Sequence, residues 1–263
     1  PNPVDSSFET LNNFTKNYGG LKYGGRIDFL PFGLFTNMGQ FRQADVMRER
    51  SLKLVFGANS SYNQGMSSRR GRIGGDFLFY NINAIDTNYR LPDYIKYGAD
   101  LLIKYKGFSL LTEYVKTQVY IADDITHRND RYNNPEEIKA FDSDDNTKEY
   151  IRSQLVLGNS INIQAGYVFK NLISIDGRFT SINSDEFSWL NNGTFYNRPN
   201  YYTFGISKYF ARNYGFKVQA SITYVEVSEN SKYNIQTEDP NKYLIIPHQG
   251  SEFLFRLISS FNF

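Results

Sequence analysis

The stretch Gly250-Ser-Glu-Phe-Leu-Phe-Arg-Leu-Ile-Ser-Ser-Phe-Asn-Phe263, at the end of the chain, decides the fold. Successive side chains of an extended strand point to opposite faces. One face of this stretch is apolar and consists of Phe253, Phe255, Leu257, Ser259, Phe261 and Phe263. The other face is mixed and carries all the charge. An apolar face that ends in an aromatic residue is typical of the closing strand of an outer-membrane β-barrel, and an ordinary sandwich strand is the alternative.

The same alternation recurs along the chain in segments of about ten residues, each followed by a turn. These segments are 21–30, 52–62, 94–106, 108–120, 161–169, 173–180, 202–210 and 216–224. In 94–106 the apolar face has tyrosine at both ends, as expected of a strand that meets lipid. With the terminal stretch this predicts about nine antiparallel strands. Residues 150–158 fit either an extension of a strand or a short helix.

An odd number of strands is unusual in bacterial barrels made from a single chain. Two explanations are open. Either strands are missing at the N-terminus, or another strand lies in 31–51 or 75–90. The chain opens on Pro1-Asn-Pro-Val4 with no signal peptide, so we expect that a leader has been removed or that the chain is truncated.

The connections between the predicted strands sort by length. The short ones span 105–108, 169–172 and 210–215, and the long ones span 63–93, 121–150, 183–200 and 227–250. The long connections are rich in Asn, Asp, Ser and charged residues. Short turns on one rim and long loops on the other are the pattern of outer-membrane barrels. A soluble sandwich has no reason to sort its loops in this way.

The composition supports this fold class. The chain has 263 residues, with 21 Tyr and 22 Phe, yet its mean hydropathy is -0.50. Many aromatic residues together with a low mean hydropathy are expected of a barrel that has aromatic girdles, a thin apolar band and a water-filled lumen. No run of residues approaches the ~18 apolar residues of a transmembrane helix. The chain has no cysteine, which excludes thiolate chemistry and fits export, and its net charge of +2 is too small to indicate nucleic acid as a partner.

Four motifs resemble the phosphate-selective porin O and P family. They are Tyr23-Gly-Gly-Arg-Ile-Asp-Phe-Leu-Pro-Phe-Gly33, Leu101-Leu-Ile-Lys-Tyr-Lys-Gly-Phe-Ser109, Ala165-Gly-Tyr-Val-Phe169 and Tyr202-Thr-Phe-Gly-Ile-Ser-Lys-Tyr209. The resemblance implies a sixteen-stranded, trimeric barrel that lets anions cross the outer membrane. Residues 1–263 would then be one domain, the C-terminal part of a longer barrel that lacks roughly its first seven strands. The family's constriction loop would lie largely in the missing part, so its phosphate site cannot be placed on these residues.

The charged residues on the inward face determine what a pore would pass. The predicted pore-lining cations are Lys22, Arg26, Lys53, Lys96, Lys104, Arg178, Lys217 and Arg256. The inward anions are Asp28, Asp100, Glu113, Asp176 and Glu252. The excess is cationic, which favours anions and phosphate. Arginine grips an oxyanion in a bidentate fork, so the three arginines are the strongest candidates. The alternative is that pairs such as Arg26 with Asp28, or Asp176 with Arg178, only brace the wall.

Three further motifs are weaker. Arg69, Arg70 and Arg72 form a basic stretch in a long loop, which either draws anions toward the mouth or is simply a solvated run of charge. The acidic stretch 142–149 has spaced carboxylates but lacks the glycine of an EF-hand loop. His127 and His248 have no metal-ligand spacing, and no set of catalytic residues accompanies them. We therefore expect no metal, no cofactor and no enzymatic activity.

The sequence therefore predicts an all-β outer-membrane porin that passes small anions passively. Its expected surroundings are lipid and lipopolysaccharide, with a homotrimer implied by the resemblance alone. The main rival is a barrel subunit that serves as a scaffold in a secretion, adhesion or uptake assembly. A plugged lumen without conductance would favour that rival. A transporter of apolar solutes is a third reading, and the polar inward face disfavours it.

Overall fold

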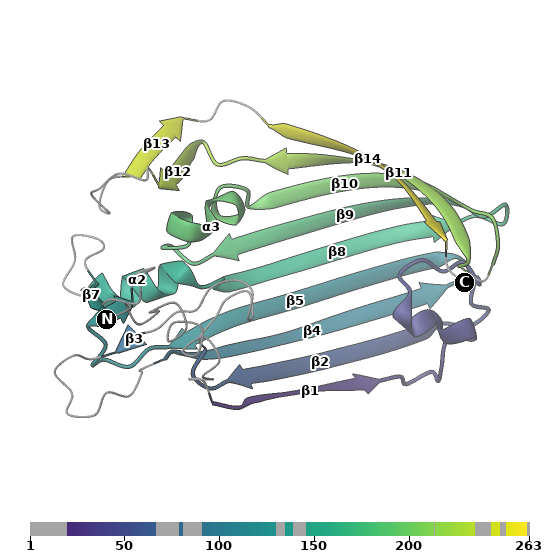
Figure 1. Cartoon of the computed structure of the whole chain (residues 1–263). Helices are drawn as coiled ribbons and strands as arrows, with labels where there is room; N and C mark the ends of the chain where they lie inside the picture. Colours follow the sequence, from purple (N-terminus) through teal and green to yellow (C-terminus); the bar gives the residue numbers. More distant parts are fainter. Residues whose placement is uncertain are drawn as a thin grey trace, which may run out of the picture.

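The computed structural model describes residues 20–66, 79–80, 91–129, 135–138, 146–212, 214–234, 243–247 and 251–261. Its main feature is a nine-stranded antiparallel sheet, which confirms the all-β prediction and the expected number of strands (Figure 1). The strands in sheet order are β1 (Lys22–Phe29), β2 (Lys53–Asn63), β4 (Asp93–Tyr105), β5 (Phe108–Tyr120), β8 (Gly158–Val168), β9 (Ile173–Ser184), β10 (Asn200–Tyr209), β11 (Phe216–Glu226) and β14 (Glu252–Phe261). Within the described residues, β1 and β14 each pair on one side only.

Shorter elements lie at the two ends of the strands. They are the 3₁₀ helix η1 (Thr36–Phe41), the helices α2 (Asn146–Gln154) and α3 (Trp189–Tyr196), and the short strands β3 (Phe79–Tyr80), β6 (His127–Asn129), β7 (Pro135–Glu137), β12 (Asn230–Asn234) and β13 (Tyr243–Pro247). The region 150–158 therefore contains the end of α2, which stops at Gln154, and the first residue of β8, Gly158. The region 31–51 contains η1 and no strand. None of the helices in the described residues is long and apolar enough to cross a membrane.

The pairing register confirms the assignment of residues to the two faces. Directly paired residues point to the same side of a sheet. One row runs through all nine strands and consists of Phe29, Phe56, Leu101, Thr112, Ile163, Phe179, Tyr202, Tyr224 and Phe253. We call the side of the sheet that carries this row the outer face. Its apolar side chains are widely exposed, as in Ile27 at 78% and Phe255 at 76%.

The opposite side is polar, and we call it the inner face. The neighbouring row on this side consists of Asp28, Gly57, Asp100, Glu113, Asn162, Thr180, Tyr201, Val225 and Glu252. The sheet curls toward this side, so that β11 and β14 turn in front of the central strands (Figure 1). All the cations predicted to line a pore lie on strands at inner-face positions.

Tight turns join the strands at one end of the sheet. The β4–β5 turn holds Lys106 at φ 49° and Gly107 at φ 99°. Two successive positive φ values define the hairpin turn whose twist matches that of its strands, and glycine adopts such values at little cost. The 169–172 and 210–215 connections lie at this end too, whereas α2, α3, β12 and β13 lie at the other (Figure 1). This is the sorting of short and long connections that the sequence predicts.

One long connection, between β1 and β2, lies at the short-turn end. Its residues 30–50, which we call the inner segment, fold onto the inner face. Phe35 packs with Val55 and Leu102 there. Val46 is fully buried in a second cluster, together with Val168 and Tyr209. The inner segment therefore covers the inner face at this end from β2 as far as β10.

Candidate functional site

A hollow on the inner face is the best candidate for a functional site. It has a volume of about 440 Å³ and is lined by β8, β9, β10, β11, β14 and one residue of α3. It exists because the two middle strands carry small side chains there, with Thr203 and Gly205 on β10 and Ser221 and Thr223 on β11. A hollow shared by five neighbouring strands requires a sheet that is concave on this side.

Arg178 lies on one side of the hollow and is held by Gln164. Its Nε and Nη2 atoms both donate to Gln164 Oε1, at 3.1 and 3.0 Å. Gln164 Nε2 in turn donates to Asp176 Oδ1 at 3.2 Å. The predicted brace between Asp176 and Arg178 is therefore indirect and passes through an amide. Within the described residues, Arg178 Nη1 has no hydrogen-bonding partner, so part of the guanidinium group is available to a solute.

Arg256 lies on the other side of the hollow. Its row contains Asp176, Gly205 and Ser221. No hydrogen bond or ion pair holds its guanidinium group in the part of the chain that the structure describes. Strands lie about 4.8 Å apart, so the backbones of Arg178 on β9 and Arg256 on β14 are separated by roughly 14 Å across the sheet. The two arginines thus flank the hollow rather than sharing one point in it.

The remaining wall is partly apolar. Phe195 of α3 is 49% exposed, and Tyr201, Leu254 and Ile258 line the hollow from the strands. The helix lies at the long-loop end, and the inner segment lies at the opposite end (Figure 1). The hollow therefore occupies the inner face between these two coverings.

Asp176 adds an unusual feature at the base of the hollow. Its Oδ2 atom is buried and has no hydrogen-bonding partner among the residues that the structure describes. The atom lies beneath Gly205, where an added Cβ would come within 3.0 Å of it. A buried polar atom without a partner is costly and calls for a donor. Gln219 Nε2 lies 3.6 Å from the same Cβ position.

The predicted pore-lining residue Arg26 serves mainly as a brace. It contacts Asp28 at 2.7 Å and Asp100 at 2.6 Å. To reach Asp100 its side chain crosses β2 directly above Gly57, where any Cβ would overlap Arg26 Nη2. In this structure Arg26 therefore pairs with neighbouring carboxylates and braces the sheet, as the alternative interpretation predicts.

Lys104 holds the inner segment. Its side chain is only 1% exposed, and Nζ donates to the carbonyl oxygens of Gly39 at 2.8 Å and Ala44 at 3.0 Å. It lies at an inner-face position as predicted, but it is covered and so is not accessible to a solute. Lys53 similarly donates to Phe32 O at 2.7 Å.

The other predicted cations are distributed over the inner face. Lys217 donates to Gln219 Oε1 at 3.0 Å, whereas Lys22 and Lys96 are exposed near the long-loop end. The basic stretch with Arg69, Arg70 and Arg72 lies outside the described residues, as do His248 and residues 142–145. His127 Nδ1 lies 2.7 Å from Thr126 Oγ1. The described residues contain no group of His, Asp and Glu that could hold a metal ion.

Acidic residues of the inner segment complete its attachment. Asp45 is fully buried and accepts from the backbone N–H groups of Glu49 and Gly107, the latter at 2.7 Å. Glu49 accepts from Thr36 N and Oγ1 at 2.6 and 2.9 Å. Tyr214 donates to Ala44 O at 2.9 Å, and burial together with the negative charge of Asp45 raises the pKa of Tyr214 well above its usual value. The segment is thus tied to two of the short turns.

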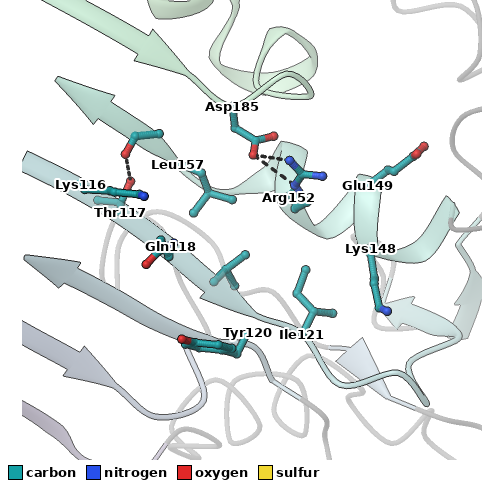
Figure 2. Close-up of a pocket in the computed structure, with 12 residues that line it drawn as sticks. Lys116, Thr117, Gln118, Tyr120, Ile121, Lys148, Glu149, Arg152, Leu157 and Asp185 are labelled. Carbon is teal, nitrogen blue, oxygen red and sulfur yellow. Dashed lines mark hydrogen bonds and ion pairs between the residues drawn. The ribbon is translucent and has the colours of Figure 1, made fainter.

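A second pocket, of about 540 Å³, lies at the long-loop end between β5 and α2 (Figure 2). Its cations are largely engaged. Figure 2 shows Arg152 turned toward Asp185, at 2.7 Å, while Lys148 points away from that pair. Lys148 contacts Asp123 at 2.6 Å, and this hydrogen bond holds the pKa of the Asp123 carboxyl below its usual range. The pocket's charges are therefore close to balanced, which makes it a weaker anion site than the hollow.

No family model, no curated protein and no solved structure matches the chain. The resemblance to the phosphate-selective porins therefore stays a prediction. Sequence reasoning named Arg178 and Arg256 as pore-lining residues but did not include Gln164 and Gln219 among them. Both glutamines follow the same alternation and could have been included on that ground. No pattern in the sequence indicates that residues 30–50 cover the inner face, because that segment has neither strand nor helix periodicity.

Proposed function

We propose that this chain forms part of the wall of an outer-membrane β-barrel whose inner face passes small anions. One observation carries the proposal: all nine strands expose an apolar outer face and carry polar residues on the other. Large contiguous apolar patches are rare on soluble monomers. Lipid is the medium in which such an outer face is stable, and water fills the inner side.

Aromatic residues along the strands support the same proposal. On β4, the outer-face residues Tyr97 and Tyr105 are eight residues apart. That separation is about 26 Å along a strand and about 20 Å along the barrel axis at a tilt of ~40°. The apolar band of an outer-membrane barrel is ~25 Å tall. The two tyrosines would therefore lie near the two interfaces, where amphipathic rings are favoured.

The preference for anions follows from which inner-face charges are free. Arg26 is neutralised by two carboxylates and Lys104 is covered. The guanidinium groups of Arg178 and Arg256 remain accessible in the hollow. They would replace part of an anion's hydration as it passes. Several weak sites in sequence let an ion leave as well as enter, so transport needs no energy source.

Closure of the barrel requires further strands. An open edge in lipid leaves backbone groups without hydrogen-bonding partners. Nine strands that alternate in direction place β1 and β14 parallel to one another. An all-antiparallel barrel therefore needs an odd number of strands between them, which gives the even total usual for bacterial barrels. A longer chain or another subunit would supply them.

Single-channel recording tests the proposal. The full protein is purified from outer membranes, inserted into a planar bilayer and studied across a salt gradient. We expect a reversal potential of the sign that indicates anion selectivity. The variant Arg178→Gln/Arg256→Gln is expected to lower that selectivity, while the control Lys170→Gln, in the exposed 169–172 turn, leaves it nearly unchanged. Cation selectivity in the unmodified protein would contradict the proposal.

The second candidate is a barrel subunit that serves as a scaffold. The inner segment favours it, because residues 30–50 cover the inner face at the short-turn end and are firmly attached there. If the missing strands leave no opening beside this segment, the barrel is plugged. Correctly folded protein without any conductance would then favour the scaffold over the porin.

A further inference from the structure

We propose that the hollow between Arg178 and Arg256 binds an acidic sugar, that is, a hydroxylated organic anion with a carboxylate or phosphate group, in preference to inorganic phosphate. This inference rests on the proposed function and names the class of solute that the same site selects. Three properties of the hollow support it: its size and the placement of its charges, its hydrogen-bonding groups, and its apolar wall.

The size and charge placement exceed what inorganic phosphate needs. One arginine suffices to grip a phosphate in a bidentate fork. Here the accessible guanidinium groups flank a hollow of about 440 Å³, with β10 and β11 between them. That volume lies within the ~300–1,000 Å³ typical of sites for organic molecules. A sugar-sized body fills the space between the arginines, with its acidic group on one of them.

The hydrogen-bonding groups between the arginines match hydroxyl groups. The hydroxyls of Thr203 and Thr223 lie 2.8 Å apart and can both donate and accept. Gln219 accepts from Lys217 through Oε1, which leaves its amide hydrogens available. Asp176 Oδ2 lies buried at the base, with no donor among the described residues. A carboxylate repels a bare phosphate dianion, so the charge of Asp176 disfavours inorganic phosphate at the base of the hollow.

The apolar wall of the hollow can contact the carbon atoms of a sugar ring. Phe195 and Tyr201 present aromatic rings at the hollow, and Leu254 and Ile258 add aliphatic surface. Inorganic phosphate gains nothing from such groups, since burial of apolar surface is favourable only for a solute that has some. Organic ligands are typically held by apolar contacts together with placed polar groups, and the hollow offers both.

Binding can be measured without relying on conductance. Trp189 is the chain's only tryptophan and lies in α3, the helix that also supplies Phe195. The full protein in detergent is titrated with glucuronate, glucose 6-phosphate, inorganic phosphate and uncharged glucose. Tryptophan emission and isothermal titration calorimetry are followed in parallel, so that a silent fluorophore does not hide binding. We expect the two acidic sugars to bind about tenfold more tightly than either phosphate or glucose.

Variants assign the binding to the hollow. Arg256→Gln removes a charge that holds none of the described residues in place, so the fold is expected to persist while acidic-sugar affinity falls about tenfold. Arg256→Lys keeps the charge but loses the bidentate geometry of the guanidinium group. Its affinity for acidic sugars should lie between those of the unmodified protein and of Arg256→Gln. The control Lys170→Gln, in the exposed 169–172 turn outside the hollow, should bind as the unmodified protein does. Equal affinity for inorganic phosphate and acidic sugars, or an Arg256→Gln variant that binds normally, overturns the inference.

The outcomes separate this inference from the porin proposal. If inorganic phosphate blocks the conductance and acidic sugars do not, the porin proposal is supported and the acidic-sugar inference is overturned. Tight binding of acidic sugars in a protein that conducts nothing would support the hollow as their site and overturn the porin. Absence of binding in both emission and calorimetry overturns the inference regardless of conductance.

Discussion

At the scale of single residues, Gly57 shows how a missing side chain determines what a charge can do. It lets Arg26 cross β2 and reach Asp100. The sequence places Arg26, Asp28 and Asp100 on one face by simple alternation. It cannot show that Arg26 is neutralised, because the pairing depends on the register that brings Gly57 between the two strands. Similarly, alternation places Lys104 on the inner face but does not reveal that residues 30–50 cover it.

The substitution Gly57→Ala tests this residue-scale account. The added Cβ overlaps Arg26 Nη2, so the side chain must leave Asp100. Because the pair is partly exposed, we expect the free energy of unfolding to fall by only about 1 kcal/mol. Urea unfolding of the full protein in detergent measures the change. Gly25→Ala is the matched control on β1, since its Cβ would meet nothing within 4 Å. Equal stability of the two variants would contradict the proposed bridge.

At the scale of elements, the strands could be predicted and the inner segment could not. The stretches 94–106 and 108–120 alternate over most of their length, and β4 and β5 match them within a residue. Residues 30–50 have no period, and long-range polar contacts such as Asp45 with Gly107 hold them in place. The sequence of 150–158, which includes the end of α2, does not decide between strand and helix, because its few apolar residues fit either.

Lys104→Met tests whether the inner segment is held as described. The substitution removes two hydrogen bonds to backbone carbonyls and leaves buried Asp45 and Glu49 without the nearby positive charge. We expect the attachment to weaken by about 2–3 kcal/mol, and trypsin to cleave after Arg42 or Arg48 at least tenfold faster. Lys53→Met is the control, because that lysine bonds one exposed carbonyl. Unchanged cleavage in Lys104→Met would show that other contacts suffice.

At the scale of the whole molecule, the number and direction of the strands determine how the two edge strands, β1 and β14, could pair. If β1 and β14 joined directly, they would have to pair in parallel. The absence of cysteine makes this testable by paired substitutions. Phe29→Cys combined in turn with Cys at Leu257, Ser259 and Phe261 should give no disulfide in the folded protein, because the proposed closure places further strands between the edges. The positive control is Gly25→Cys with Ser60→Cys, which are directly paired. Efficient cross-linking between β1 and β14 would contradict the odd-strand closure.

The claim on which the whole account depends is that the outer face meets lipid and the inner face meets water. Single cysteines at Ile175, Gly177 and Phe179 on the outer face, and at Asp176, Arg178 and Thr180 on the inner face, test it directly along β9. The full protein in lipid vesicles is treated with a membrane-impermeant maleimide. The account predicts rapid labelling at the inner-face positions and protection at the outer-face positions, alternating residue by residue. Labelling at equal rates on both faces would contradict it.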